Sequence, residues 1–435
     1  MNYQDTITYL YNRLPVYQQV GGIAYKEGLD NSLALDLYFN HPHLKYKTIH
    51  VAGTNGKGST SHLLAATLQQ AGYKVGLYTS PHLLDFRERI RINGTMISEQ
   101  YVINFVANHK ANYEPIQPSF FELTMMMAFC YFADKEVDIA IIEVGLGGRL
   151  DSTNIITPIA SVITNISLDH TQFLGNSLVQ IAREKAGIIK TNVPAIIGEA
   201  EADIRSVFEQ QAQLVNAPIT FAQDKQIIQS AGRDKDGSWL FQTATYPNLK
   251  GQLSGLAQLK NAATVLSVIE VLQKQGITVS LNSVYEAFAH VVELTGLQGR
   301  WQLIQGTNPR IICDTGHNTG GIKYVVEQLN TEQYDTLRMV IGMVNDKDVN
   351  EVLKLLPKHA IYYFTRAAIQ RALDQDRLTE LANAIGLDGN TYNSIDQAIQ
   401  AALDDANTKD LVFIGGSNFV VAEALTYFES LAKRN

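Results

Sequence analysis

Apolar runs of strand length alternate with stretches of helical periodicity along most of this chain. Such alternation is typical of an α/β fold built on a largely parallel sheet. In the first half, runs rich in β-branched residues predict strands, and the intervals between them repeat apolar residues at the spacing of a helix face. The predicted strands are 48–52, 74–78, 138–144, 160–166 and 193–197, and the predicted helices are 60–70, 122–134 and 177–189.

The pattern changes twice after residue 200. Between 219 and 251, two alternating runs flank Lys235-Asp236-Gly237, a turn signal that predicts an antiparallel hairpin. A second α/β series begins near Gln298. We therefore expect a hinge at 296–300 and two domains, 1–297 and 298–435. The second is predicted to contain strands 310–314, 337–342, 360–364 and 411–415, with helices 321–329, 349–356, 377–385 and 418–431.

A glycine-rich loop lies between the first predicted strand and its helix. Glycines let backbone N–H groups face an anion, the helix N-terminus adds its positive dipole end, and Lys57 supplies a cation. Gly58 separates Lys57 from Ser59, so the spacing departs from G-x-x-x-x-G-K-[ST], and a purely structural turn is the alternative. We predict an ATP-binding loop made of Gly53, Thr54, Asn55, Gly56, Lys57, Gly58, Ser59 and Thr60.

Polar residues also follow or end other predicted strands, where parallel sheets gather ligand-binding groups. Ser80 and the strand-terminal carboxylate Glu143 are candidate Mg²⁺ ligands, and His170 is a candidate for a second ion. Read alone, Ser80 fits an ordinary turn, Glu143 an ion-paired or capping acid, and His170 a structural histidine. Asp314 and His317 follow a strand of the second half in the same way, so we expect the active site to lie between the domains.

Three further segments have competing interpretations on composition alone. The run around Arg87 and Arg91 is either functional or a solvated face, and the charged helix 183–190 resembles a solvated face. Asn261 opens an apolar run and could simply mark a helix N-terminus.

Composition excludes some classes of protein. The 435 residues are 46% hydrophobic and 18% charged, and their net charge of −8 gives no support to nucleic-acid binding, which requires a basic stripe. No apolar run is long enough to span a membrane, and residues 1–10 do not resemble a signal peptide. Cys130 and Cys313 lie in apolar runs and are expected to be buried free thiols, which favours the cytoplasm.

Taken in order, these motifs resemble the folylpolyglutamate synthase/dihydrofolate synthase family of the Mur ligase superfamily, which are ATP-dependent amide ligases. The resemblance extends from about residue 20 to the C-terminus. Phe120-Phe121-Glu122 resembles the family's loop near the pterin site. Gln298-Gly299-Arg300 replaces the family's Pro-Gly-Arg, and Asp314-Thr315-Gly316-His317-Asn318 replaces Asp-Gly-Ala-His-Asn. The motifs are 53–59, 79–83, 143–154, 169–170, 183–187, 314–318 and 342–348.

This resemblance implies a reaction and a set of roles. ATP phosphorylates a folate or dihydropteroate carboxylate, and the amine of L-glutamate attacks the acyl phosphate, with dihydrofolate synthase and folylpolyglutamate synthase activities both expected. It implies a P-loop-type ATPase domain with a mostly parallel sheet, then a smaller Rossmann-like glutamate-ligase domain. It also implies two Mg²⁺ ions, a carbamylated Lys185 and a monomer, and it suggests K⁺ as a further cation. The implied roles are catalysis for Lys57, Lys185 and His317; nucleotide binding for Gly53–Thr60, Asn261, Arg300 and Asp314; metal binding for Ser80, Glu143, His170 and Lys185; pterin binding for Phe121 and Asp151; and glutamate binding for Arg89 and Ser417.

Three other classes fit the motifs less well. A cell-wall Mur ligase is expected to carry a UDP-binding domain ahead of the phosphate loop, which here starts at Gly53. A P-loop switch module would not need the Lys185 and His317 motifs, and a nicotinamide-dependent dehydrogenase would not need Lys57 in its glycine loop. The sequence does not decide whether dihydropteroate, a folate or both accept the glutamate.

Overall fold

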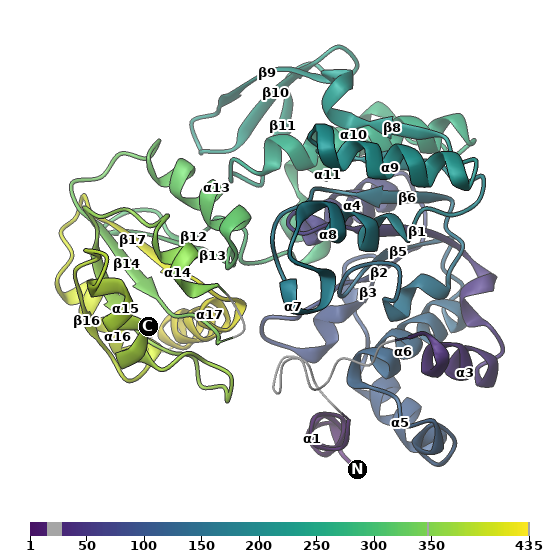
Figure 1. Cartoon of the computed structure of the whole chain (residues 1–435), viewed down its shortest axis with the longest axis horizontal. Coiled ribbons are helices and arrows are strands. Elements are labelled where there is room, and N and C mark those ends of the chain that lie inside the picture. Colours follow the sequence, from purple (N-terminus) through teal and green to yellow (C-terminus); the bar gives the residue numbers. More distant parts are fainter. Residues whose placement is uncertain (15–27, 346–347, 434–435) are drawn as a thin grey trace. The chain divides into compact units, whose positions relative to one another are not determined.

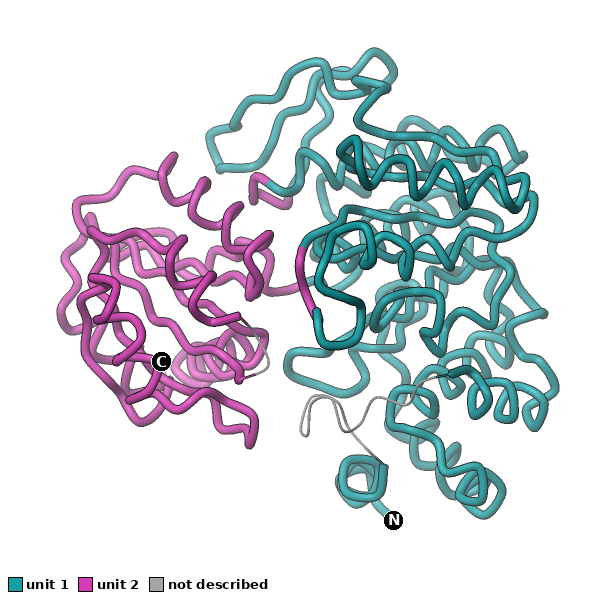
Figure 2. Tube along the Cα trace, viewed as in Figure 1, with its two compact units in different colours: residues 1–167, 171–252, 257–297 teal, residues 168–170, 253–256, 298–435 magenta. Residues whose placement is uncertain are grey.

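The computed structural model describes residues 1–14, 28–345 and 348–433. The described chain forms two compact units, each presented by itself (Figure 2). Unit 1 comprises residues 1–167, 171–252 and 257–297, and unit 2 comprises 168–170, 253–256 and 298–435. The predicted start of the resemblance near residue 20, and Asp346 and Lys347 of the 342–348 motif, lie outside the described residues.

Unit 1 is built on an eight-stranded sheet in the order β4-β3-β2-β5-β1-β6-β7-β8 (Figure 1). The six strands from β2 to β8 in this order are parallel, and β3 and β4 are added antiparallel at one edge. Apolar side chains fill the central strands because both faces of the sheet are covered. The strands are β1 Lys47–Ala52, β2 Val75–Tyr78, β3 Ile90–Ile92, β4 Thr95–Met96, β5 Ile139–Glu143, β6 Ala160–Ile163, β7 Ala195–Ile197 and β8 Ile219–Phe221.

Helices cover this sheet and bury its apolar side chains. Helix α6 packs with Ala140 and Ile142 of β5 in one core cluster, and Ala52, Ile163 and Ile197 pack in another with α8 and α9. Helix α4 packs against α10, α11 and α12. The helices are α1 Tyr3–Arg13, α3 Asp30–Tyr38, α4 Lys57–Gln70, α5 Glu99–Tyr113, α6 Phe120–Asp134, α7 Thr171–Leu174, α8 Leu178–Ala186, α9 Ala202–Leu214, α10 Gln258–Lys274, α11 Leu281–Ala289 and α12 Val291–Thr295, with short 3₁₀ turns η2 Pro42–Lys45, η3 Phe86–Arg89, η4 Glu114–Ile116, η5 Ser152–Ile155 and η6 Ala222–Lys225.

The predicted hairpin is present as part of a small antiparallel sheet in unit 1. Strands β9 Ile228–Arg233 and β10 Trp239–Thr243 pair across the predicted turn, and β11 Leu249–Gly251 pairs with β10. The segment from residue 219 was wrongly included in the hairpin, because β8 continues the large parallel sheet.

Unit 2 has a six-stranded sheet in the order β12-β13-β17-β14-β15-β16, parallel except for β12. Its core packs Trp301, Met339 and Phe413 with the surrounding helices. Strands β13 and β17 match their predicted bounds, whereas the edge strands β12 and β16 were not predicted. The elements are β12 Gln302–Gln305, β13 Arg310–Asp314, β14 Leu337–Ile341, β15 Ile361–Phe364, β16 Gly389–Thr391 and β17 Leu411–Gly415, with helices α13 Thr319–Leu329, α14 Val349–Leu353, α15 Gln375–Asn383, α16 Ile395–Asp404 and α17 Asn418–Ala432.

The predicted α/β fold class is confirmed in both units. Strand β6 ends at Ile163 instead of residue 166, because Thr164 and Asn165 turn to hydrogen-bond the glycine loop after β1. Cys130 and Cys313 are buried free thiols, as predicted. Among the described residues, no helix is both long enough and apolar enough to cross a membrane.

Candidate active site

The glycine loop of unit 1 connects β1 to α4 in the strand–loop–helix order that the sequence predicts. Gly53 has φ 144° and Gly56 has φ 85°, conformations that favour glycine. Their neighbours also exclude a side chain: a Cβ at Gly53 would lie 1.8 Å from Thr164 Oγ1, and one at Gly56 would lie 2.3 Å from Asn261 Oδ1. Helix α4 starts at Lys57, three residues before its predicted start.

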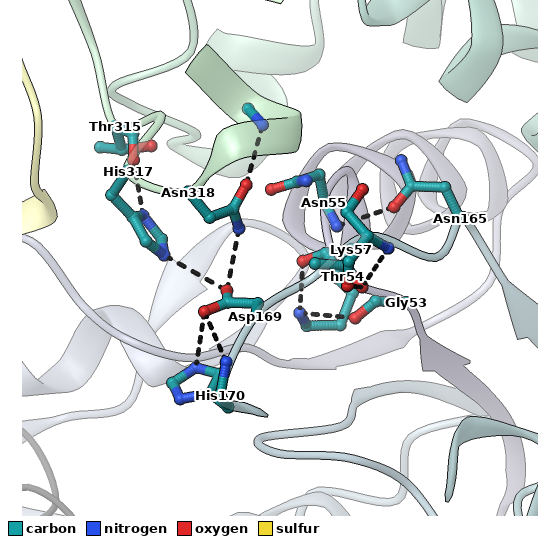
Figure 3. Close-up of polar contacts among 12 residues, drawn as sticks. Gly53, Thr54, Asn55, Lys57, Asn165, Asp169, His170, Thr315, His317 and Asn318 are labelled. Atoms are coloured by element: carbon teal, nitrogen blue, oxygen red, sulfur yellow. Dashed lines mark hydrogen bonds and ion pairs between the residues drawn. The ribbon is translucent and has the colours of Figure 1, made fainter. Parts of the chain in front are cut away.

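Residues that follow β6 hold this loop. The Thr54 N–H donates to the Asn165 carbonyl at 3.0 Å, and the Asn55 N–H donates to Asn165 Oδ1 at 2.9 Å (Figure 3). Thr164 Oγ1 donates to the Asn55 carbonyl at 2.6 Å. Because Thr54 and Asn55 are already engaged, the N–H groups suited to a phosphate are those of the first turn of α4.

Two lysines from different helices converge on one backbone oxygen of the loop. Lys57 Nζ donates to the carbonyls of Gly53 and Thr54 at 3.0 and 3.1 Å (Figure 3). Lys185 Nζ, from α8, donates to the same Gly53 carbonyl at 2.9 Å, and Lys185 is only 4% exposed. The solvated-face interpretation of helix 183–190 is therefore wrong for Lys185. Two cations beside a glycine loop suit the binding of a polyanion.

A short relay of side chains connects α10 to the phosphate loop helix. Asn261 Nδ2 donates to Gln258 Oε1 at 3.0 Å, and Gln258 Nε2 donates to Ser59 Oγ at 3.3 Å. Helix α10 begins at Gln258, so Asn261 lies in its first turn and does not cap it. Gln258 was not predicted from the sequence, where its only signal is its position three residues before Asn261. Thr60 is fully buried behind the loop.

Ser80 and Glu143 lie together at the ends of the adjacent strands β2 and β5. The Ser80 N–H donates to Glu143 Oε2 at 3.1 Å, and Glu143 is 3% exposed. A carboxylate this buried suits a divalent cation. His170 lies on segment 168–170, which belongs to unit 2, and its N–H donates to Asp169 Oδ1 at 2.9 Å. Among the described residues, no three His, Cys, Asp or Glu side chains form a metal-binding cluster.

The loop after β5 contacts several of the predicted substrate-side residues. A Cβ at Gly145 would lie 2.5 Å from the Phe121 ring, so the ring rests on this glycine. Asp151 is buried and accepts hydrogen bonds from the N–H groups of Leu146 and Thr153 at 2.7 and 3.0 Å. Burial raises the Asp151 pKa, although these hydrogen bonds oppose the rise.

The charged run 87–91 is not a uniform solvated face. Arg89 is 2% exposed, and its Nε donates to His82 Nδ1 at 2.7 Å while its guanidinium lies 5.2 Å from the centre of the Phe120 ring. Arg91 is also buried, whereas Arg87 pairs with Asp85 at 2.6 Å. The structure therefore places Arg89 inside unit 1, against His82.

In unit 2, the residues after β13 surround a carboxylate. Asp314 accepts hydrogen bonds from the N–H groups of Trp301 and Gly316, each at 2.7 Å. Arg300 donates to the Thr315 hydroxyl and to the Gly299 carbonyl. Burial raises the Asp314 pKa, and the nearby Arg300 partly offsets this. Ser417, the other predicted glutamate-side residue, caps α17 by accepting from the Val420 N–H at 3.2 Å.

His317 is oriented from both sides of its ring in unit 2. Its Nδ1 donates to the Thr315 carbonyl at 2.8 Å, which leaves Nε2 facing Asp169 Oδ2 at 3.8 Å (Figure 3). Asn318 Nδ2 donates to the same Asp169 oxygen at 2.8 Å, and Asn318 also caps α13. The motif 169–170 contains Asp169, but the sequence motif does not predict this contact.

Comparison with known proteins gives matches along the whole chain. Residues 51–269 match the Mur ligase middle domain, and residues 299–418 match the Mur ligase glutamate ligase domain. The dihydrofolate synthase/folylpolyglutamate synthase of Bacillus subtilis is 31% identical over 97% of this chain and 98% of its own length. The folylpolyglutamate synthase of Lacticaseibacillus casei is 30% identical over 95% and 96%.

Solved structures also match this chain along nearly its whole length. The structure of E. coli FolC in complex with DHPP and ADP superposes with a TM-score of 0.85 at 31% identity, covering 100% of this chain and 99% of that one. A bifunctional folylpolyglutamate synthase/dihydrofolate synthase with Mn, AMPPNP and L-glutamate bound gives a TM-score of 0.81 at 29% identity, with 99% and 98% covered.

Proposed function

Because this chain belongs to the folylpolyglutamate synthase/dihydrofolate synthase family of Mur ligases, we propose that it joins L-glutamate to a pterin-containing carboxylic acid. It is an ATP-dependent ligase. The observation that carries the proposal is the convergence of Lys57 and Lys185 on the Gly53 carbonyl of a glycine loop. The three other classes considered from the sequence lack this support, because the relatives that match nearly the whole chain are synthases of this family.

The proposed reaction has two steps. The substrate carboxylate attacks the γ-phosphorus of ATP, and the bond to ADP breaks, which gives an acyl phosphate. The amine of L-glutamate then attacks the acyl carbon, phosphate leaves, and the amine releases a proton. Lys57 and the first turn of α4 offset charge on the transferring phosphoryl group, while Asn261, Arg300 and Asp314 bind the nucleotide.

Divalent cations are proposed to take part in the first step, the phosphorylation of the substrate carboxylate. Glu143 and Ser80 fit one Mg²⁺ ion, since a nearly fully buried carboxylate lies beside the Ser80 N–H. His170 and a carbamylated Lys185 are proposed for a second ion, with K⁺ as a further cation. Carbamylation joins the neutral Lys185 amine to CO₂ with loss of one proton, and it turns a cation into an anionic ligand. The metal offsets charge on phosphate oxygens when bound.

The remaining roles concern substrates and assembly. Phe121 and Asp151 are proposed for the pterin end, and Arg89 and Ser417 for L-glutamate. Arg89 is buried against His82, to which its Nε donates. His317 is proposed to act near the reacting groups. We also propose a cytoplasmic monomer that binds no nucleic acid, and light scattering during gel filtration tests its mass.

The experiment compares dihydropteroate and tetrahydrofolate as acceptors in the presence of ATP, Mg²⁺ and L-glutamate. We expect both acceptors to gain one glutamate by mass, with one ADP released per bond formed. Reactions without ATP or without acceptor are the controls. Acceptor-independent ADP release, or no glutamylated product from either acceptor, would contradict the proposal.

A further inference from the structure

His50 is a fully buried histidine in the strand that leads into the phosphate loop. It lies in β1, between Ile142 of β5 and Ser161 of β6 in the sheet register. Its Nε2 lies 2.8 Å from the hydroxyl of Thr153, which is also fully buried. The two residues are separated by 103 positions in the sequence. Neither was singled out as a candidate for function by the sequence motifs.

The direction of the hydrogen bonds in this contact is determined by Asp151. The Thr153 hydroxyl donates its single proton to Asp151 Oδ1, and the Thr153 N–H donates to the same oxygen at 3.0 Å. The hydroxyl can therefore only accept from His50, so His50 Nε2 carries the proton. His50 Nδ1 has no hydrogen-bond partner among the described residues. Burial lowers the His50 pKa to about 3, so the ring is neutral.

Asp151 in turn closes the loop that follows β5. Its second oxygen accepts the Leu146 N–H at 2.7 Å, so one carboxylate joins residues 146 and 153. A carboxylate has about four acceptor positions, and at least three donors already engage this one. Asp151 therefore holds the loop, and this is how it would contribute to the proposed pterin end beside Phe121.

The loop held in this way contacts both the Phe121 ring and helix α8, which carries Lys185. Gly145 supports the Phe121 ring, as a Cβ there would lie 2.5 Å from it. Gly148 packs on α8, where a Cβ would lie 2.8 Å from the Glu184 carbonyl and 3.0 Å from the Cα of Lys185. The phosphate loop also has a holding residue of its own, because Asn165 accepts from the N–H groups of Thr54 and Asn55.

We propose that His50 and Thr153 are positioning residues for the acceptor substrate, acting through Asp151 to hold residues 145–153 against Phe121. The inference rests on the proposed function, because the acceptor is taken to be a pteridine whose flat ring meets Phe121. His50 and Thr153 would then set the affinity for the acceptor and leave the affinity for ATP unchanged.

The test compares Thr153→Val with Thr153→Ser, and His50→Leu with His50→Gln. Valine and leucine remove the relay at similar volume, whereas serine keeps the hydroxyl and glutamine keeps an N–H donor at similar reach. We expect Thr153→Val and His50→Leu each to raise the KM for tetrahydrofolate about tenfold, with the KM for ATP unchanged. Thr153→Ser and His50→Gln should restore most of the loss. The double variant Thr153→Val/His50→Leu should cost no more than either single change.

Thr67→Val is the matched control. Thr67 is also fully buried, and its hydroxyl donates to the Leu63 carbonyl, at 2.7 Å within α4. We expect it to leave both KM values unchanged and to lower the Tm less than Thr153→Val does, because Thr153→Val removes two buried hydrogen bonds. If either Thr153→Val or His50→Leu unfolds, the other variant decides the question, because each breaks the same His50–Thr153 contact.

An equal rise in both KM values, or an unchanged acceptor KM in folded Thr153→Val, would overturn the inference. Failure of the proposed function is a different result, because the unsubstituted enzyme would then glutamylate neither acceptor.

Discussion

The loops at the carboxyl ends of the two largely parallel sheets lie at equivalent positions in the fold, but they gather groups of opposite charge. In unit 1, the loop after β1 presents the Gly53 carbonyl, and the Nζ groups of Lys57 from α4 and Lys185 from α8 both donate to it. In unit 2, the loop after β13 instead surrounds a carboxylate, Asp314, with two backbone N–H donors and Arg300 nearby. Parallel sheets place polar groups at this edge in both cases. The type of residue, and not the architecture, decides which charge each edge can receive.

The two edges also differ in how their loops are held. The glycine loop of unit 1 is held by Asn165 and Thr164, which lie on the next strand connection. In unit 2, Asn318 and Ser417 cap their own helices, and Asn318 also donates to Asp169. A loop held by distant residues can be disturbed from a distance, whereas a capped helix start depends mainly on its own residues.

The largest effect is expected from separating the units. Residues 1–297 alone should keep the eight-stranded sheet and bind ADP weakly, because this sheet has its own core clusters. They should form no ligation product, since Asp314 and His317 are absent. Circular dichroism, ADP titration and product mass check this. Ligation by this fragment would show that unit 1 contains the whole site.

Loss of the phosphate-loop cation should be the next largest effect. Lys57→Ala removes a charge that offsets the transferring phosphoryl group, and kcat should fall about a thousandfold. Lys135→Ala, an exposed lysine of the same unit, is the control and should keep wild-type turnover. Near-native ligation by folded Lys57→Ala would show that the cationic edge of the unit 1 sheet is not needed for phosphoryl transfer.

Lys185→Ala tests the proposed carbamylation of Lys185. We expect kcat to fall about a hundredfold, and acetate to restore part of it by standing in for the lost carbamate. Turnover of the unsubstituted enzyme should rise with bicarbonate. If Lys185→Ala is active and neither acetate nor bicarbonate changes its turnover, Lys185 is only a structural donor to the Gly53 carbonyl.

His317→Ala tests the catalytic role proposed for the loop after β13 in unit 2. The ring is oriented by Thr315 and faces Asp169, so its loss should lower kcat about tenfold to a hundredfold. The Kd for ADP should change little, and His359→Ala, an exposed histidine of unit 2, should behave like the wild type. A large loss of nucleotide affinity with kcat retained would instead assign His317 to binding.

The smallest effect concerns the glycines. Gly56 and Gly72 both have left-handed backbones, with φ 85° and 92°, but a Cβ meets Asn261 at Gly56 and nothing within 4 Å at Gly72. Both alanine variants should lose about 1 kcal/mol of stability from backbone strain. Only Gly56→Ala should also weaken ADP binding, by displacing Asn261. Equal ADP affinity in the two variants would show that the Gly56–Asn261 contact is not used.

Local pattern was sufficient for much of the fold. The period of apolar residues predicted the α/β class, the strands β1, β5, β13 and β17, and the hairpin of β9 and β10. It did not predict the edge strands β12 and β16. These strands are short and have few buried residues, so they carry little periodicity.

The composition of single segments misled where tertiary contacts decide burial. Helix 183–190 and the run 87–91 contain enough charge to resemble solvated faces, yet Lys185 and Arg89 are buried. A long cationic side chain can be buried when a distant acceptor receives its protons, and the segment itself does not reveal that acceptor. The resemblance to a known family, and not the pattern, pointed to Lys185.

The sequence by itself determined the phosphate loop, because glycine, lysine and the strand–helix order are all local. It also placed Ser80 and Glu143 at strand ends, which adjacent strands then bring together. Only the tertiary structure decided that Lys185 reaches Gly53, that Asn261 covers Gly56 and that His50 meets Thr153. These contacts depend on strand order, with β1 between β5 and β6. Hydrophobic periodicity reports which face of an element is buried, and it carries no information about which strand becomes its neighbour.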